Sequence, residues 1–255
     1  MRPLLAAFAV SLAVNGAFFA LASSRRSDAV TDLSYSLSFA LVVALQAWAG
    51  GAGDPLRLAA ACMVVLWALR LGSYLFARIL RMKVDRRFDG IRERPLKFGA
   101  FWLFQALAVP VILLPVLRVL SAPTPPPSPL HAAGAALWLA GLLLEAVADA
   151  QKAAWKRRGG QGPLTRGLWA WSRHPNYFGE ILLWWGLWIF ALPSLAGGWH
   201  LVVLGPCFLT LLIRFGTGIP PLEQAAELRA RGDADLRDYR TRTSLLVPWP
   251  PRRTG

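Results

Sequence analysis

Long apolar runs separated by short polar segments dominate the chain. About seven of these runs reach the roughly 20 mostly apolar residues that a membrane-spanning helix needs. They cover residues 3–22, 33–50, 57–77, 98–119, 131–150, 178–193 and 199–215. A proline-rich segment over residues 123–129 separates the fourth run from the fifth, because proline cannot continue a helix. The pattern predicts an all-α polytopic membrane bundle of about seven transmembrane helices, with residues 1–255 as a single membrane domain.

The amino-acid composition agrees with a membrane protein. Apolar residues make up 55% of the chain and charged residues only 16%, whereas soluble domains carry about 25% charged residues. Cys62 and Cys207 both lie in apolar runs and form no motif with the three scattered histidines, so we predict no metal site. A lipid bilayer is the expected environment of this chain.

Basic residues are distributed unevenly between the two sides of the predicted bundle. If the N-terminus faces outward, the inner segments 23–32, 78–97, 151–177 and 214–255 hold 24 of the 28 lysines and arginines. Cytoplasmic loops carry such an excess, so we predict an outer N-terminus, a cytosolic tail over residues 216–255 and a site facing the cytosol. The net charge of +14 is then a topology signal, and no nucleic-acid partner is expected. The predicted location is a bacterial inner membrane.

Ionisable residues are rare within the apolar runs, and each one is a candidate for a functional role. Glu145, Asp149, Lys152 and Lys156 follow one another at spacings of four, three and four residues. These spacings place them on one helix face that runs from the membrane to the cytosolic interface. The alternative is a ladder of surface ion pairs, with the lysines reaching toward lipid headgroups.

The densest group of polar residues lies over residues 171–180. Pro175 suits the first position of a helix, so unpaired backbone N–H groups and Arg173 together favour an anion site there. Asn176 and Glu180 are four residues apart and share a helix face that can hydrogen-bond a ribose or a carboxamide. Alternatively, Asn176 caps the helix and Glu180 pairs with Arg173.

Two further candidates lie outside that segment. Arg70 and Tyr74 share a face of the third run, where Tyr74 could donate a proton inside the bundle or anchor the helix at the interface. A short amphipathic helix is expected to open after Pro220, and its Glu223 could cover the same cytosolic opening. A solvated surface helix is the alternative for this segment.

Residues 172–180, Ser-Arg-His-Pro-Asn-Tyr-Phe-Gly-Glu, resemble the signature of the steroid 5α-reductase-like membrane proteins, in particular a bacterial branch of unknown substrate. The similarity covers about residues 60–251 and includes Gly-Leu-Trp at 167–169 and Tyr-Arg at 239–240. The resemblance implies a seven-helix bundle that takes NADPH from the cytosol. A hydride would then pass to an activated C=C bond of a hydrophobic substrate, a steroid-like or other enone lipid.

The resemblance also implies roles for individual residues. The position of Asp149 contacts the adenosine part of NADPH in relatives, and basic residues serve as phosphate partners. The positions of Asn176 and Glu180 contact its nicotinamide-ribose end in relatives. Together with the residue pattern above, this gives the predicted NADPH-binding set, which is Glu145, Asp149, Lys152, Lys156, Arg157, Arg173, His174, Asn176, Tyr177, Glu180 and Glu223. Trp67 occupies the position of the family's substrate-polarising tyrosine, so Tyr74 is the substitute proton donor, with Arg70 beside it as the second catalytic residue.

Two other functions remain open from the sequence. Membrane methyltransferases of the isoprenylcysteine or phospholipid type use S-adenosylmethionine and share an Arg-His-Pro-x-Tyr motif. They tend to carry paired glutamates after the last span, whereas this chain has Leu222 before Glu223. A non-catalytic lipid-binding protein is the second alternative. The face shared by Asp149 and Lys156, together with Asn176 and Glu180, leads us to prefer the reductase.

Overall fold

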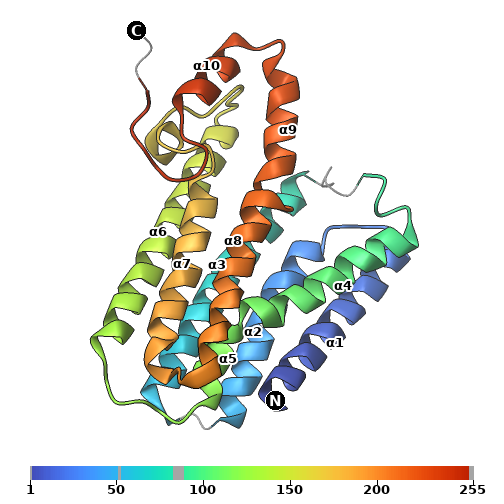
Figure 1. The fold of residues 1–255 in the computed structure, drawn as a ribbon. Coiled ribbons are helices and arrows are strands. Elements are labelled where there is room, and N and C mark those ends of the chain that lie inside the picture. The colour runs from blue at the N-terminus through green and yellow to red at the C-terminus, as the bar shows by residue number, and fades with distance from the viewer. Residues whose placement is uncertain (1, 51–52, 83–88, 253–255) are drawn as a thin grey trace. The chain divides into compact units, whose positions relative to one another are not determined.

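A computed structural model describes residues 2–50, 53–82 and 89–252 of the chain, and these ranges are helical without a β-strand (Figure 1). Parts of the predicted loops and tail, at 51–52, 83–88 and 253–255, lie outside the described residues. Within the described ranges, six helical stretches are long and apolar enough to cross a membrane. The chain is therefore an integral membrane protein by the length and composition of its helices, while the predicted orientation stays a prediction.

The helices follow the predicted runs closely in most of the chain. In order, they are α1 (Arg2–Arg25), α2 (Thr31–Ala49), α3 (Pro55–Met82), α4 (Pro95–Ile112), α5 (Leu114–Ser121), α6 (Pro129–Arg157), α7 (Pro175–Ala191), α8 (Leu204–Phe215), α9 (Ile219–Ala230) and α10 (Ala234–Arg242). Short 3-10 turns lie at Gly167–Ala170 (η2), Leu192–Ser194 (η3) and Gly197–Val203 (η4). The expected helix after Pro220 is present as α9.

The predicted run 98–119 is two helices rather than one. α4 ends at Ile112 and α5 begins at Leu114, because Pro115 has no N–H to continue the α-helical hydrogen bonds of α4. The runs at 178–193 and 199–215 also differ from the prediction. α7 begins at Pro175 and is 17 residues long, and a 3-10 turn precedes α8 in place of one continuous helix.

The described chain divides into two compact units, each built from two separate stretches of sequence. The first unit comprises Met1–Ser128 with Ala191–Gly205, and the second comprises Pro129–Phe190 with Pro206–Gly255. The first holds α1 to α5, and the second holds α6, α7, α9, α10 and most of α8.

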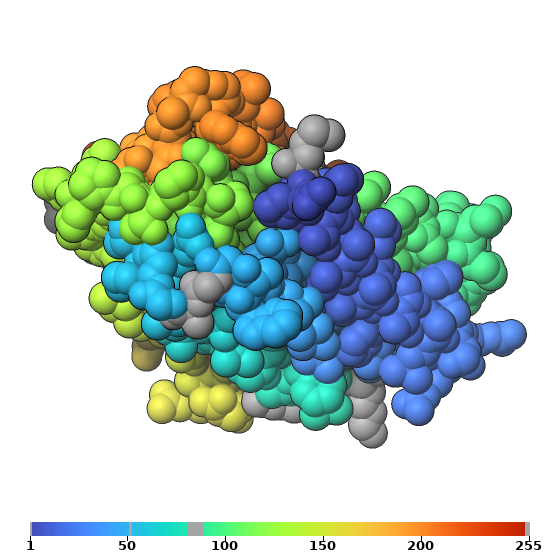
Figure 2. All heavy atoms as spheres, turned by 90° about the horizontal axis from the view of Figure 1, so that it is seen from below, coloured from blue at the N-terminus to red at the C-terminus, as the bar shows by residue number. Residues whose placement is uncertain are grey.

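A network of buried polar side chains joins three helices of the first unit. Gln105 of α4 donates to Asn15 Oδ1 of α1 at 2.7 Å and to Ser34 Oγ of α2 at 2.9 Å. Asn15 in turn donates to Ser38 Oγ at 2.9 Å, and Ser11 Oγ donates to the α4 backbone at 2.8 Å. Each of these side chains is at most 7% exposed, and hydrogen bonds between apolar helices hold such helices together. The side chains of the first helices, blue in Figure 2, pack against one another on the face shown there.

A second polar cluster in the first unit surrounds Asp54, just before α3. Its carboxylate accepts hydrogen bonds from the Thr124 hydroxyl and from the backbone N–H of Leu56, the latter at 2.9 Å. It also pairs with Arg57, whose guanidinium donates to the carbonyl of Ala122 at 2.7 Å. The Thr124 hydrogen bond is the largest influence on the Asp54 carboxyl and holds its pKa below the usual value of 3.8.

Acid should weaken the contacts around Asp54. A carboxyl whose pKa is lowered in the folded state contributes stability that is present above its unfolded pKa and is lost as the pH falls through the folded value. We expect the melting temperature of the detergent-solubilised protein to fall from pH 5 toward pH 3, and to fall less in Asp54→Asn. An equally steep acid limb in Asp54→Asn would contradict this assignment.

In the second unit, α6 and α7 run antiparallel in close contact along paired glycines (Figure 1). A Cβ atom on Gly141 would lie 2.5 Å from the Leu183 nitrogen and 2.6 Å from the Gly179 carbonyl oxygen. One on Gly186 would lie 2.5 Å from the Trp138 nitrogen. Only residues without a side chain allow backbones to approach so closely. The paired glycines fix the register of α6 on α7, and with it the polar residues at the ends of these two helices.

Candidate functional site

Glu223 is the centre of a charged cluster in the second unit. The Arg173 guanidinium donates to Glu223 Oε2 at 2.6 Å, and His174 Nε2 lies 2.8 Å from Glu223 Oε1. The Arg240 guanidinium lies 3.4 Å from Oε2. We call these four residues the Glu223 cluster. It joins the segment before α7 to the second turn of α9 and to α10, and all four side chains are largely withdrawn from solvent.

The backbone around Arg173 explains why the cluster forms. Pro175 begins α7, so the preceding residues leave the helix, and the His174 N–H donates to Ser172 Oγ at 3.1 Å. Ser172 Oγ donates onward to the Leu246 carbonyl at 2.7 Å, and the Arg173 N–H donates to the Ser244 carbonyl at 2.8 Å. The side chains of Arg173 and His174 are thus presented from a backbone held on both sides.

Burial shifts the pKa of two side chains, those of Arg173 in the cluster and Tyr239 on α10. Burial lowers the pKa of the Arg173 guanidinium, and the carboxylate of Glu223 opposes that effect. Arginine nevertheless stays charged in proteins. Burial also raises the pKa of the Tyr239 phenol, so its hydroxyl keeps its proton and donates to the Trp169 carbonyl at 2.7 Å.

Carboxylates on α6 lie beside the amide of α7. Asn176 donates to Asp149 Oδ1 at 3.3 Å, and Asp149 and Glu145 are 5% and 2% exposed. Glu145 packs against Gly179, the residue before Glu180. The predicted face of α6 therefore carries buried acidic groups at the end of the helix pair. The alternative pairing of Arg173 with Glu180 is not the one observed, because Arg173 pairs with Glu223.

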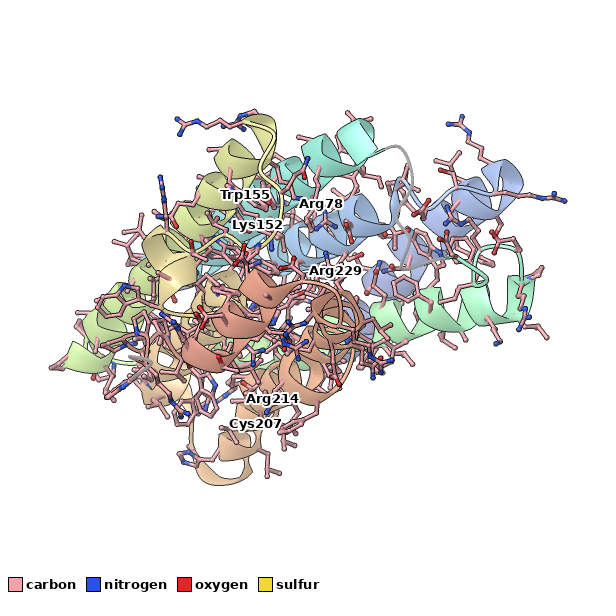
Figure 3. All side chains as sticks on the ribbon, turned by 90° about the horizontal axis from the view of Figure 1, so that it is seen from above. Arg78, Lys152, Trp155, Cys207, Arg214 and Arg229 are labelled. Carbon is pink, nitrogen blue, oxygen red and sulfur yellow. The ribbon has the colours of Figure 1, made fainter. Side chains whose placement is uncertain are left out.

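The two lysines of the predicted α6 face lie over tryptophan rings. Lys152 Nζ lies 4.1 Å from the centre of the Trp169 ring, and Lys156 Nζ lies 4.7 Å from that of Trp155. Arg157 is exposed. Figure 3 labels Lys152 and Trp155 near the end of α6. These contacts are cation–π interactions.

The remaining predicted residues divide between the two units. Tyr177 stacks on His174, with ring centres 5.8 Å apart and planes inclined by 19°. Arg70 and Tyr74 lie on α3 in the first unit, and their catalytic role stays a prediction. Arg240 is part of the Glu223 cluster and Ser172 supports its backbone, although the sequence pattern assigned neither residue a role. The only sequence signal for them was their position in 172–180 and 239–240, the stretches that resemble the steroid 5α-reductase-like proteins.

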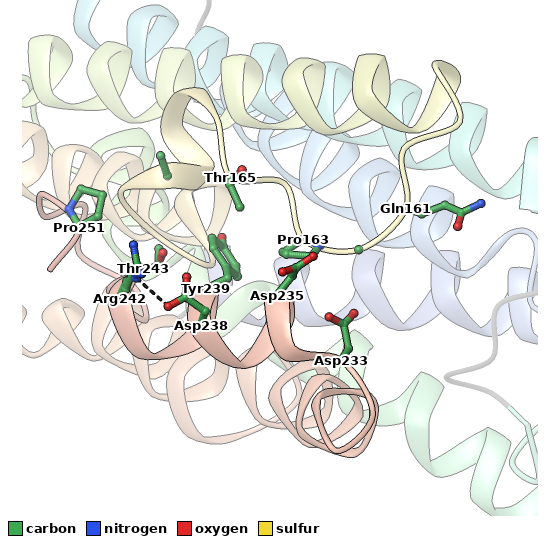
Figure 4. Close-up of a pocket in the computed structure, with 12 residues that line it drawn as sticks. Gln161, Pro163, Thr165, Asp233, Asp235, Asp238, Tyr239, Arg242, Thr243 and Pro251 are labelled. Atoms are coloured by element: carbon green, nitrogen blue, oxygen red, sulfur yellow. Dashed lines mark hydrogen bonds and ion pairs between the residues drawn. The ribbon is translucent and has the colours of Figure 1, made fainter. Parts of the chain in front are cut away.

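A cavity of about 500 Å³ opens in the second unit between residues 161–165 and α10 (Figure 4). Its lining includes Pro163, Tyr239 and three aspartates of the α10 region. The predicted site residues do not line it. Asp233 caps α10 by accepting from the Leu236 N–H, and Asp238 pairs with Arg242 at 2.7 Å. These two carboxylates therefore have structural partners of their own.

Apolar helices and a charged cluster beside the start of α7 define a polytopic helical membrane protein. The chain belongs to a family described as a protein of unknown function (DUF1295), which matches residues 18–243. It is also similar to the methanethiol S-methyltransferase of Mycobacterium tuberculosis, with 33% identity over 88 residues. That match covers 34% of this chain and 31% of the relative, so the chain spans about a third of the curated relative's length. No solved structure matches the chain.

These comparisons correct the predicted reaction. Hydride transfer from NADPH to a lipid C=C bond is contradicted because the named relative is a methyltransferase. The site gives a physical reason: the carboxylates of Glu145 and Asp149 are buried on α6, and they repel phosphates. The NADPH and oxidoreductase predictions are wrong, and membership among the steroid reductases is not supported. The expected branch of unknown substrate agrees with the family's description.

Proposed function

We propose that the chain is a membrane methyltransferase that uses S-adenosylmethionine. The similarity to a methanethiol S-methyltransferase supports this class of enzyme. The acceptor is then a thiol or a related soft nucleophile, either small or carried on a hydrophobic molecule. A site open to the cytosol would give the water-soluble methyl donor access to an acceptor that partitions into the bilayer.

The observation that carries the proposal is the contact between two distant parts of the chain. Membrane methyltransferases of the type considered above combine an Arg-His-Pro-x-Tyr motif with glutamate after the last span. Here Arg173 and His174 both bind Glu223, about 50 residues further along the chain. The glutamate pair of that pattern is reduced to Glu223, because residue 222 is a leucine.

The charges of the site suit this donor. S-Adenosylmethionine carries a positive sulfonium and a positive ammonium group beside one carboxylate. The buried carboxylates of Glu145 and Asp149 favour its positive groups, and the Glu223 cluster offers a guanidinium to its carboxylate. The Asp149–Asn176 pair offers the acceptor and donor groups that bind ribose hydroxyls. The residues present therefore fit this donor better than an anionic dinucleotide.

The chemistry of the proposed reaction needs little from the protein beyond binding and alignment. When bound, the donor supplies a methyl group on a positively charged sulfur. The acceptor sulfur forms a bond to that methyl carbon while the bond to the donor sulfur breaks, and the thiol proton leaves to water. The chain's residues hold the two molecules in line, which is the usual source of rate in such transfers.

Binding of the donor and its product tests the proposal. We expect S-adenosylmethionine and S-adenosylhomocysteine to raise the melting temperature of the detergent-solubilised protein, with NADPH as a control ligand that leaves it unchanged. Transfer of a labelled methyl group to methanethiol and to longer-chain thiols would then identify the acceptor. If neither methyl-donor ligand changes the melting temperature at millimolar concentration, the proposal is wrong.

A further inference from the structure

The last part of the described chain lies along the segment that carries Arg173 and His174. We call residues 239–249 the C-terminal strap. Its Ser244 carbonyl accepts from the Arg173 N–H, and its Leu246 carbonyl accepts from the fully buried Ser172 hydroxyl. The Trp249 N–H donates to the Trp171 carbonyl at 3.0 Å. Residues 172 and 244 thereby form an isolated parallel bridge.

The strap also reaches Glu223 directly, through Arg240. One guanidinium nitrogen lies 3.4 Å from Glu223 Oε2, and the other donates to the Glu223 carbonyl oxygen at 3.5 Å. The neighbouring residue on α10, Tyr239, donates to the Trp169 carbonyl. Two adjacent side chains of the strap therefore hold the two sides of the site: Tyr239 holds the segment before α7, and Arg240 holds the second turn of α9.

We propose that the C-terminal strap is a positioning element of the methyl-donor site, and that Arg240 is the positioning residue that orients the Glu223 carboxylate toward Arg173 and His174. The proposal rests on the proposed function only for the identity of the ligand. Arg240 contacts Glu223, and as a positioning residue it would act on the ligand through Glu223. Its guanidinium limits the rotation of the carboxylate, so the charged pairs are formed before the ligand arrives and less ordering is needed on binding.

The rival explanation is that the strap only closes the end of the helix pair. Arg237 makes this explanation testable because it lies on the same helix, carries the same charge and holds the opposite end of α9. It donates to the Ala230 carbonyl at 2.8 Å and to the Arg231 carbonyl at 3.2 Å. Replacing Arg237 removes a link between α10 and α9 and leaves the contacts around Glu223 in place.

The experiment compares Arg240→Gln, Arg240→Lys and Arg237→Gln in the full-length protein in detergent. We expect Arg240→Gln to weaken S-adenosylhomocysteine binding by roughly 10-fold, with a raised KM for the donor and a kcat within about twofold of the wild type. Arg240→Lys should restore part of the loss because it keeps the charge. Arg237→Gln should leave the Kd within about twofold of the wild type. Equal weakening by Arg237→Gln and Arg240→Gln, or an unchanged Kd in Arg240→Gln, would overturn the proposal.

A second measurement separates this proposal from the proposed function. If the wild-type protein binds no S-adenosylhomocysteine, the methyltransferase proposal fails, and amide hydrogen exchange of Arg173 and His174 becomes the test of the strap. Faster exchange there in Arg240→Gln than in Arg237→Gln supports positioning by Arg240. The same exchange rates in both variants contradict it, whatever the ligand of the site is.

Discussion

Replacing Glu223 by glutamine is expected to weaken S-adenosylhomocysteine binding by about 100-fold. The change removes the negative charge that holds Arg173 and Arg240 together and turns two charge-assisted hydrogen bonds into weak contacts. Without their shared carboxylate, the guanidiniums of Arg173 and Arg240 repel each other. Isothermal titration calorimetry in detergent measures the effect, and a thermal melt of the same sample reports whether the helix bundle remains folded.

Glu227→Gln is the matched control for this change. Glu227 lies one turn further along α9, and its side chain is 70% exposed, 3.9 Å from Arg240. Exposed ion pairs contribute little, so binding should stay within about twofold of the wild type. A double variant with Arg173→Gln separates pairing from direct contact. If Glu223 acts only through Arg173, the double variant binds as weakly as Glu223→Gln alone. Wild-type binding by Glu223→Gln would remove the cluster from the site.

Gly141→Ala is expected to destabilise the protein by about 3 kcal/mol or more. The added Cβ would meet the backbone nitrogen of Leu183 and the carbonyl oxygen of Gly179 at 2.5 and 2.6 Å. Neither atom can move unless α6 separates from α7, so the strain cannot be relieved by a side-chain rotation. Thermal unfolding in detergent measures the loss.

The control for Gly141→Ala is Gly16→Ala in the middle of α1. A Cβ on Gly16 would meet nothing within 4 Å, and alanine is favoured over glycine inside a helix by about 0.5–1 kcal/mol. Its melting temperature should stay level or rise. Similar melting temperatures for the two variants would show that α6 and α7 are not held by their close glycine contacts.

The sequence predicted the helices that carry the site residues better than the side-chain partners of those residues. Pro175 marked the start of α7 because proline fits the first turn of a helix, and the spacing of Glu145 and Asp149 placed both on one buried face. The partner of Arg173 could not be read from spacing. Glu180 and Glu223 were both available in the sequence, and only the folding of α9 back onto the segment before α7 decides between them.

Two features of the fold escaped the sequence analysis for different reasons. The break between α4 and α5 lies inside a continuous apolar run, where hydropathy alone does not register the missing N–H of Pro115. The buried network of the first unit uses neutral side chains, whereas the residues expected to be functional within the apolar runs were ionisable. Its signal was present in the sequence: Ser11 and Asn15, like Ser34 and Ser38, stand four residues apart and so share a helix face.

The interleaving of the two units has a consequence for how the chain is made. Arg118 donates to the Ser194 carbonyl at 3.1 Å and lies over the Trp199 ring, so the first unit uses residues that the ribosome adds after most of α7. During synthesis, the packing of α1 to α5 therefore stays incomplete until residues 191–205 have left the ribosome. Cutting the chain between Ser128 and Pro129 would leave residues 191–205 of the first unit on the second product, and the co-expressed halves would have to reassemble to yield the first unit whole.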